Sequence, residues 1–109
     1  MYIKEILNNF EKDGYKVSLP NVDFKNISIC FVEINNNRKS YCKIKNSPIF
    51  YYIIEGDGIF MIDNDLKVKQ GDLLEIATNK KYTYKGNMKM LEIIPNSFEN
   101  LSIEEDLIN

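Results

Sequence analysis

The chain of 109 residues contains no histidine and no tryptophan, and its only cysteines are Cys30 and Cys42. Histidine is the side chain that proteins most often use to bind transition metals, so its absence restricts metal chemistry more than any residue that is present. The two cysteines have no CxxC or other metal-ligand spacing, and two thiols alone do not complete a zinc site. We expect both to be small core or sheet residues in a reducing compartment.

Other absences exclude several classes of protein. No run of about 18 apolar residues could span a membrane, and the first residues are too polar for a signal peptide. A net charge of -2 and a pI near 5.2 argue against a nucleic-acid-binding surface. The chain also lacks a Gly-rich phosphate loop, a GxSxG elbow and an HExxH motif. We therefore expect a cytoplasmic protein that binds neither nucleic acid nor membrane.

The composition, with 44% hydrophobic and 28% charged residues, is typical of one globular domain spanning residues 1–109. We divide it into an N-terminal helix and loop (1–20), a β-barrel (24–98) and a C-terminal tail (99–109). The helix is predicted because Ile3, Ile6, Leu7 and Phe10 follow helical spacing before Gly14.

A second short helix, from Ile103 to Leu107, is predicted because Ser102 and Glu105 match a capping box. The segments between the two ends are rich in β-branched and aromatic residues, which favours strands. These strands are FKNISICFVEI, SYCKIK, IFYYIIEG, GIFMI, LKVKQ, LLEIA, KYTY and MKMLEII. Turn residues separate them at 35–38, 56–58, 63–65 and 85–87. Short strands spaced every 8–12 residues or so predict an all-β sandwich or barrel.

Two segments carry a resemblance to a known family. YYIIEGDG resembles the YYVLEGEG segment of cupins, and KQGDLLEIATNKKY resembles their KAGDLVFIPAGTPH segment. The resemblance extends over roughly Asn26 to Phe98. It implies a cupin-type double-stranded β-helix, or jelly-roll barrel, here with a short helix at each end. Cupins commonly pair through their sheets, so the resemblance also implies a homodimer.

The metal ligands of the family are replaced in this chain. Counting from Gly56 places Ile49 at the glutamate position and Lys43 and Lys45 at the two histidine positions, or Cys42 and Ile44 if one residue is inserted. Counting from Gly71 places Tyr82 at the last histidine position. Ammonium groups repel cations and isoleucine has no lone pair. We therefore expect no metal and no other cofactor.

The alternation of strand residues predicts which side chains face a pocket between the sheets. The inward set is expected to be Lys43, Lys45, Ile49, Tyr51 and Ile53, with Tyr82 and Tyr84 from the second motif. Met88, Met90 and Glu92 share one face of the last strand, and which face that is stays open. Glu75 interrupts an apolar strand and, if buried, would need a lysine partner. The predicted ligand-binding residues are Lys43, Lys45, Tyr51, Glu75, Tyr82 and Tyr84.

Three functions fit these residues. The first is a metal-free protein that binds a small molecule, such as a sugar or an organic acid, inside the barrel. Lysine would hold an acidic group and tyrosine would provide a flat apolar face. The second is a metal-independent isomerase, epimerase or lyase that uses lysine, tyrosine or glutamate. The third is a dimeric interaction module with a filled barrel. We favour the first, and no catalytic residue is assigned.

Overall fold

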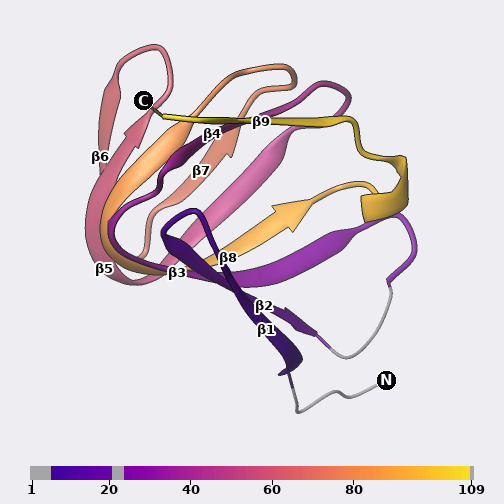
Figure 1. Ribbon diagram of the computed structural model, residues 1–109, viewed down its shortest axis with the longest axis horizontal. Coiled ribbons are helices and arrows are strands. Elements are labelled where there is room, and N and C mark those ends of the chain that lie inside the picture. Colours follow the sequence, from indigo (N-terminus) through magenta and orange to yellow (C-terminus); the bar gives the residue numbers. More distant parts are fainter. Residues whose placement is uncertain (1–5, 21–23, 109) are drawn as a thin grey trace.

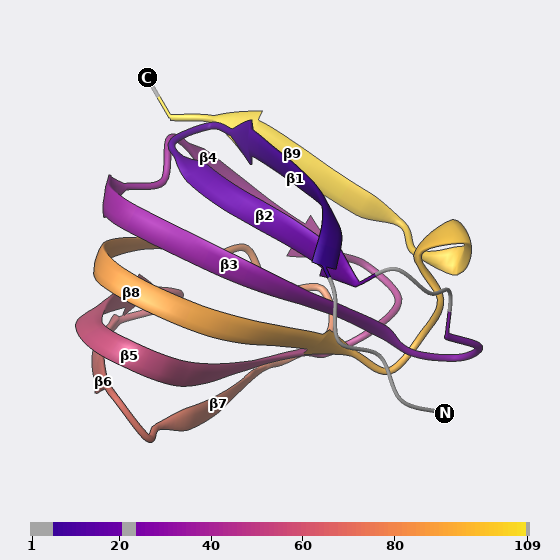
Figure 2. The same cartoon turned by 90° about the horizontal axis from the view of Figure 1, so that it is seen from below.

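Two long antiparallel strands, β5 (Ile49–Met61) and β8 (Thr83–Ile94), lie at the centre of the computed structural model, which describes residues 6–20 and 24–108. β8 also pairs with β3 (Ser28–Asn37), while β5 pairs with β6 (Asp65–Lys69) and β7 (Leu73–Ile76). β1 (Ile6–Lys12) and β2 (Tyr15–Pro20) complete a seven-stranded sheet in the order β1-β2-β3-β8-β5-β6. Figure 2 shows how strongly this sheet curves.

A second sheet closes the barrel. It contains β4 (Ser40–Ile44) and β9 (Ile103–Leu107), and the two figures show it lying across from the curved sheet. The backbones of Cys42 and Tyr82 join the two sheets through a pair of hydrogen bonds with N···O distances of 2.8 and 2.9 Å. The predicted all-β barrel is therefore confirmed.

Alternate side chains of these strands fill the interior. Two-residue periodicity turns one face of each strand inward, and the buried positions follow it in β3, in β5 as far as Ile53 and in β8 from Tyr84 onward. The fully buried large side chains are Tyr51, Tyr82, Tyr84, Phe60, Ile34, Ile49, Ile53, Ile76, Met90, Ile94 and Val32, together with Thr83. The interior thus combines an apolar core with an unusual number of tyrosines.

The predicted N-terminal helix is wrong for the described residues. β1 and β2 form a hairpin in which Lys12 pairs with Tyr15 across Asp13 and Gly14. Both turn residues have positive φ, 46° and 88°, as a type I′ turn requires. An Asp-Gly pair is a strong hairpin signal, and here it outweighs an apolar stripe too short to hold an isolated helix. Ile3, which began that stripe, lies outside the described residues.

The predicted C-terminal helix is also wrong. A single 3-10 turn, η1 (Phe98–Asn100), precedes β9, which pairs with β4 from Ser40–Leu107 to Ile44–Ile103. Five residues are too few for a stable helix, whereas β9 satisfies the unpaired backbone groups of β4. Ser102 takes part in this pairing, because its carbonyl accepts from the Lys45 N–H at 2.8 Å. Within residues 6–20 and 24–108, no helix is long and apolar enough to cross a membrane.

Two of the predicted turns are bends within continuous strands. Gly56 lies inside β5 and Gly86 inside β8, with φ of +89° and +129°. A side chain at Gly56 would come within 1.9 Å of the Asn87 carbonyl oxygen, and one at Gly86 within 2.6 Å of the Asp57 carbonyl oxygen. Glycine at these positions lets the paired strands approach closely and bend together. The hairpin predicted at residues 63–65 is confirmed, because Met61 pairs with Asp65.

Candidate functional site

A buried arginine lies in the barrel interior. Arg38 follows β3 and has only 4% of its surface exposed. Its Nε donates to Ser40 Oγ at 3.1 Å, Nη1 donates to the Tyr84 hydroxyl at 3.3 Å, and Nη2 donates to the Tyr15 hydroxyl at 3.3 Å. The guanidinium carbon also lies 4.3 Å from the centroid of the Tyr15 ring. Arginine stays charged at any accessible pH, so the interior holds a permanent positive charge.

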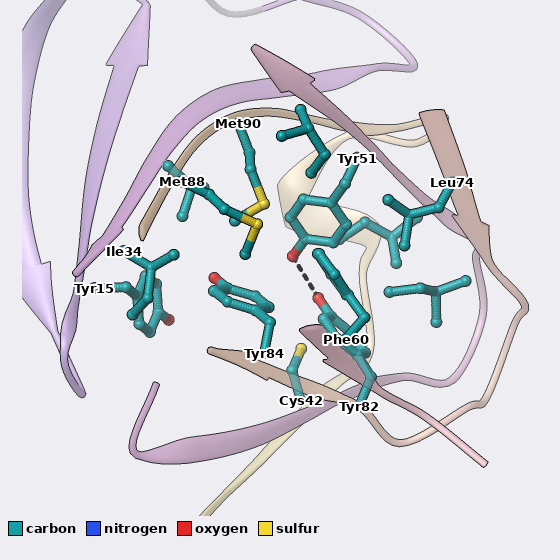
Figure 3. Close-up of a cluster of buried hydrophobic side chains, with 14 of the residues drawn as sticks. Tyr15, Ile34, Cys42, Tyr51, Phe60, Leu74, Tyr82, Tyr84, Met88 and Met90 are labelled. Carbon is teal, nitrogen blue, oxygen red and sulfur yellow. Dashed lines mark hydrogen bonds between the residues drawn. The ribbon is translucent and has the colours of Figure 1, made fainter. Parts of the chain in front are cut away.

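Two tyrosines and a glutamate form a hydrogen-bonded chain in the same interior. The Tyr51 and Tyr82 hydroxyl oxygens are 2.7 Å apart, and Tyr51 donates to Glu92 Oε2 at 3.3 Å. Figure 3 shows the Tyr51 and Tyr82 hydroxyl groups pointing at each other. Because Tyr51 uses its proton for Glu92, Tyr82 must be the donor to Tyr51. The chain therefore runs from Tyr82 through Tyr51 to the carboxylate.

Burial shifts the pKa values of the three residues in this hydrogen-bonded chain. Desolvation raises the pKa of Glu92, while the charge of Arg38 and the hydrogen bond from Tyr51 oppose that shift. Desolvation also raises the pKa values of Tyr51 and Tyr82 well above 10. Both tyrosines thus remain protonated donors, and Glu92 is a stronger base than an ordinary carboxylate.

These groups line one cavity of about 290 Å³, whose wall includes Arg38, Tyr51, Tyr82 and Glu92. Lys12 from β1 and Glu105 from β9 also line it. Lys12 Nζ lies 2.6 Å from Glu105 Oε2, so this ion pair links the N-terminal hairpin to β9. A larger hollow of about 840 Å³ lies over the bend of β5 and β8, but it is open and its charged lining residues are lysines and aspartates of the surface. The cavity with the buried polar groups is the better candidate site.

The structure brings together three of the six predicted site residues. Tyr51, Tyr82 and Tyr84 are all buried, and their rings contact one another with centroids 5.8 to 6.4 Å apart. Their predicted inward orientation is confirmed, as is that of Ile49 and Ile53. Tyr84 reaches the site through its hydrogen bond from Arg38. Ligand binding by these residues remains a prediction.

The other three predicted residues do not line the cavity, and the expected inward orientation of Lys43 and Lys45 is wrong. Lys43 and Lys45 pair with Glu104 outside it, with Nζ···O distances of 3.4 and 2.6 Å. Glu75 is exposed on β7, opposite Phe50.

The physical reason is the register of β4. Cys42 and Ile44 are the buried residues of this strand, so the alignment with one inserted residue is the correct one. A shift of one residue moves every side chain of a strand to the opposite face. In β7, Leu74 and Ile76 are the buried residues, which leaves Glu75 outside.

Sequence reasoning missed Arg38, Tyr15 and Glu105, and it left the face of Glu92 open. A signal for Arg38 exists, because it is the only arginine among 14 basic residues. A chain that otherwise uses lysine has a reason to place arginine where a fixed fork of donors is needed. Glu92 shares strand parity with Met88 and Met90, which are both buried.

The residues of this interior do not fit the metal that the fold implies. The inward side chains at the four ligand positions are Cys42, Ile44, Ile49 and Tyr82. Isoleucine cannot coordinate a metal, so at most two donors remain. Within the part of the chain that the structure describes, no three His, Cys, Asp or Glu residues cluster as metal ligands would.

Comparison with known proteins identifies the fold. No protein-family model matches the chain, and no curated protein matches its sequence. Among solved structures, Streptomyces Pac13, described as a nucleoside dehydratase, is 18% identical with a TM-score of 0.82, over 97% of this chain and 91% of Pac13. Other Pac13 structures contain uridine.

Two further structures are similar. Ectoine synthase from P. lautus is 14% identical with a TM-score of 0.73, over 100% of this chain and 92% of its own. An RmlC-like cupin from Shewanella frigidimarina is 10% identical with a TM-score of 0.72, over 85% of this chain and 86% of its own. The chain therefore has the cupin fold.

Proposed function

We propose that this chain binds a small molecule in the 290 Å³ cavity and carries out metal-independent acid–base chemistry on it. The observation that supports the proposal most is the chain Tyr82–Tyr51–Glu92, which shares one cavity with Arg38. A base and a fixed cation can abstract a proton next to a carbonyl, and a proton donor can protonate a leaving group. The likeness to a nucleoside dehydratase and to ectoine synthase supports a small polar substrate.

The reaction class that uses all these groups is elimination of water. Glu92 would take a proton from the carbon next to a carbonyl group, and Arg38 would stabilise the negative charge that develops on the carbonyl oxygen. Tyr82 would give its proton to the departing hydroxyl group. The C–H and C–O bonds break, a C=C bond forms and water leaves. The protons of Glu92 and Tyr82 are then rebalanced through Tyr51, which lies between them.

A two-step experiment tests this function. A thermal-shift screen of uridine, sugars and small hydroxy acids identifies ligands that stabilise the folded state. Each ligand is then incubated with the protein in D₂O, and NMR follows exchange of its acidic C–H proton together with loss of water. Proton exchange that depends on the protein is expected. Failure to bind any ligand, or binding without exchange, would contradict the catalytic part of the proposal.

Matched variants assign the base. Glu92→Gln should lower the rate of proton exchange at least a hundredfold, because general-base catalysis contributes about 10²–10⁴-fold to a rate. Glu75→Gln, an equal change on the exposed face of β7, should leave exchange unaltered. Equal losses in the two variants would show that Glu92 is not the base.

We also propose that the chain forms a homodimer through the outer face of the large sheet. A row of apolar residues crosses four strands there, because Phe31, Leu91, Tyr52 and Leu73 are register partners in β3, β8, β5 and β7. Leu73 is 66% exposed and Tyr52 40%. The adjacent row, Glu33–Lys89–Glu55, carries both signs of charge, which a rotated second copy can match.

Light scattering tests the dimer. Tyr52→Glu should convert the protein to a monomer, since a charge at the centre of an apolar interface is costly. Leu66→Glu, at a position of β6 that is 46% exposed and lies outside this row, is the control. A monomeric wild-type protein at micromolar concentration would contradict the proposal.

A further inference from the structure

We infer that the carbonyl group bound by Arg38 belongs to a carboxylate of the ligand, which displaces Glu105 from the guanidinium. The inference rests on the small-molecule function proposed above and specifies the chemical class of the ligand. It also assigns Glu105 a role as the internal stand-in for that carboxylate.

The hydrogen bonding of Arg38 is incomplete. A guanidinium has five N–H donors, and three of those of Arg38 bond to Ser40, Tyr84 and Tyr15. The two that remain, one on each Nη, have no hydrogen-bonding partner among the described residues. All three partners are neutral hydroxyl groups, which leave the charge of Arg38 uncompensated. A buried charge is costly unless an opposite charge pairs with it.

The carboxylates near Arg38 compensate this charge poorly. Glu105 Oε1 is 3.8 Å from Arg38 Nη2, which is too long for a hydrogen bond. The other oxygen of Glu105 is committed to Lys12, at 2.6 Å. Glu92 accepts from Tyr51 and forms no ion pair with Arg38 in the described structure. A carboxylate at hydrogen-bonding distance from Arg38 would therefore be better bound than Glu105 is.

Glu105 can leave Arg38 at small cost. It belongs to β9, which among the described strands pairs only with β4, and 24% of the Glu105 side chain is exposed. Lys12, whose side chain is 46% exposed, can retain the Glu105 carboxylate as it moves outward. The ligand carboxylate would then take the two unused N–H donors, the fork geometry in which arginine binds carboxylates most strongly.

The aromatic side chains in the cavity wall indicate the size and shape of the rest of the ligand. Tyr15, Tyr51 and Tyr82 line it together with the exposed rings of Phe10 and Phe98. A cavity of about 290 Å³ accommodates one small ring with a short substituent. Benzoate and benzamide have this size and nearly the same shape, and they differ chiefly in charge.

Titration of these two probes, followed by NMR, tests the inference. Benzoate should bind at least tenfold more tightly than benzamide, because charge-assisted bonds to arginine are about twice as strong as neutral ones. Glu105→Gln should strengthen benzoate binding severalfold and leave benzamide binding unchanged, since it removes the competing carboxylate.

Glu104→Gln is the matched control, because Glu104 lies on the same strand but pairs with Lys43 and Lys45 outside the cavity. It should alter neither affinity. Arg38→Met should abolish the preference for benzoate, and the comparison of Glu105→Gln with Glu104→Gln decides the question even if Arg38→Met fails to fold.

Three results would overturn the inference: equal affinity for the two probes, no binding of either, or weaker benzoate binding by Glu105→Gln. If the probes bind equally while a neutral hit from the ligand screen still undergoes proton exchange, the proposed function stands and only the carboxylate is excluded. If nothing binds in the cavity, both proposals fail.

Discussion

The interior of the barrel has two parts that the same strands build side by side. One part is packed and lies away from the cavity, with Val32, Ile34, Ile49, Ile53, Phe60, Val68, Leu74, Ile76, Met88 and Met90. The other is the cavity wall, with Arg38, Glu92, Tyr15, Tyr51 and Tyr82. β5 contributes Ile53 to the packed part and Tyr51 to the wall, and β8 contributes Met90 and Glu92 in the same way. A step of two residues along one strand thus leads from a side chain that stabilises the fold to one that lines the candidate site.

The packed part should give the largest stability effect. Ile53→Ala removes a fully buried side chain and leaves a cavity, which costs about 2–5 kcal/mol. Urea unfolding measures the change, and a variant that still folds should keep its ligand affinity. A loss below about 1 kcal/mol would show that the packed part does not carry the stability.

The tyrosine chain should give a smaller effect whose size depends on position. Tyr51→Phe leaves both Tyr82 and Glu92 without their partner, so we expect a cost of about 1–3 kcal/mol. Tyr82→Phe leaves Tyr51 still bonded to Glu92 and should cost about 0.5–1.5 kcal/mol. Urea denaturation of the two variants compares them. Equal costs would contradict the order Tyr82–Tyr51–Glu92.

Glu92 should give an effect that depends on pH. Because burial raises its folded-state pKa, the folded protein retains a proton that the unfolded chain releases. The contribution of Glu92 to the free energy of unfolding therefore decreases as pH rises from the unfolded pKa of about 4.3 through the folded pKa. Glu92→Gln should gain stability relative to the wild type over this window and show no relative gain below it. Unfolding measured from pH 3 to 8 checks the sign, and a gain confined to low pH would contradict it.

The smallest effect should come from outside the barrel. Lys43→Ala removes a partly exposed partner of Glu104, and exposed ion pairs contribute only about 0.2–1 kcal/mol. Binding of benzoate should not change. A loss of binding in titrations of this variant would place Lys43 at the site after all, as strand alternation first suggested.

The sequence predicted the barrel well because strands and turns leave local signals. Alternation and turn residues marked the segments that form β3 to β8, although the turns predicted at 56–58 and 85–87 are bends within β5 and β8. The two terminal helices were predicted wrongly because five to eight residues of helical spacing are weak evidence against tertiary pairing. For β1 the turn at Asp13 and Gly14 held the stronger local signal.

The site was harder to predict, because it depends on register and on contacts distant in sequence. Tyr51 and Tyr82 were found from motif positions, yet their partner Glu92 is 41 residues from Tyr51. Lys43 and Lys45 were predicted to face inward because the alignment of β4 was wrong by one residue. Since side chains alternate between the two faces of a strand, that error places both lysines on the wrong face. Arg38 lies in a polar turn that composition alone describes as solvent-exposed. Only the folded chain shows that its side chain enters the barrel.

The acidic run in β9 lets the charge pairing of Arg38 tolerate a shift of that strand by one residue. Glu104, Glu105 and Asp106 are consecutive, and only the middle one reaches Arg38 in the observed register. If β9 slid by one residue along β4 in either direction, an acidic neighbour would take the place of Glu105. The guanidinium would then face a carboxylate in each of three registers, so a slip of one residue would not leave the positive charge beside an apolar side chain.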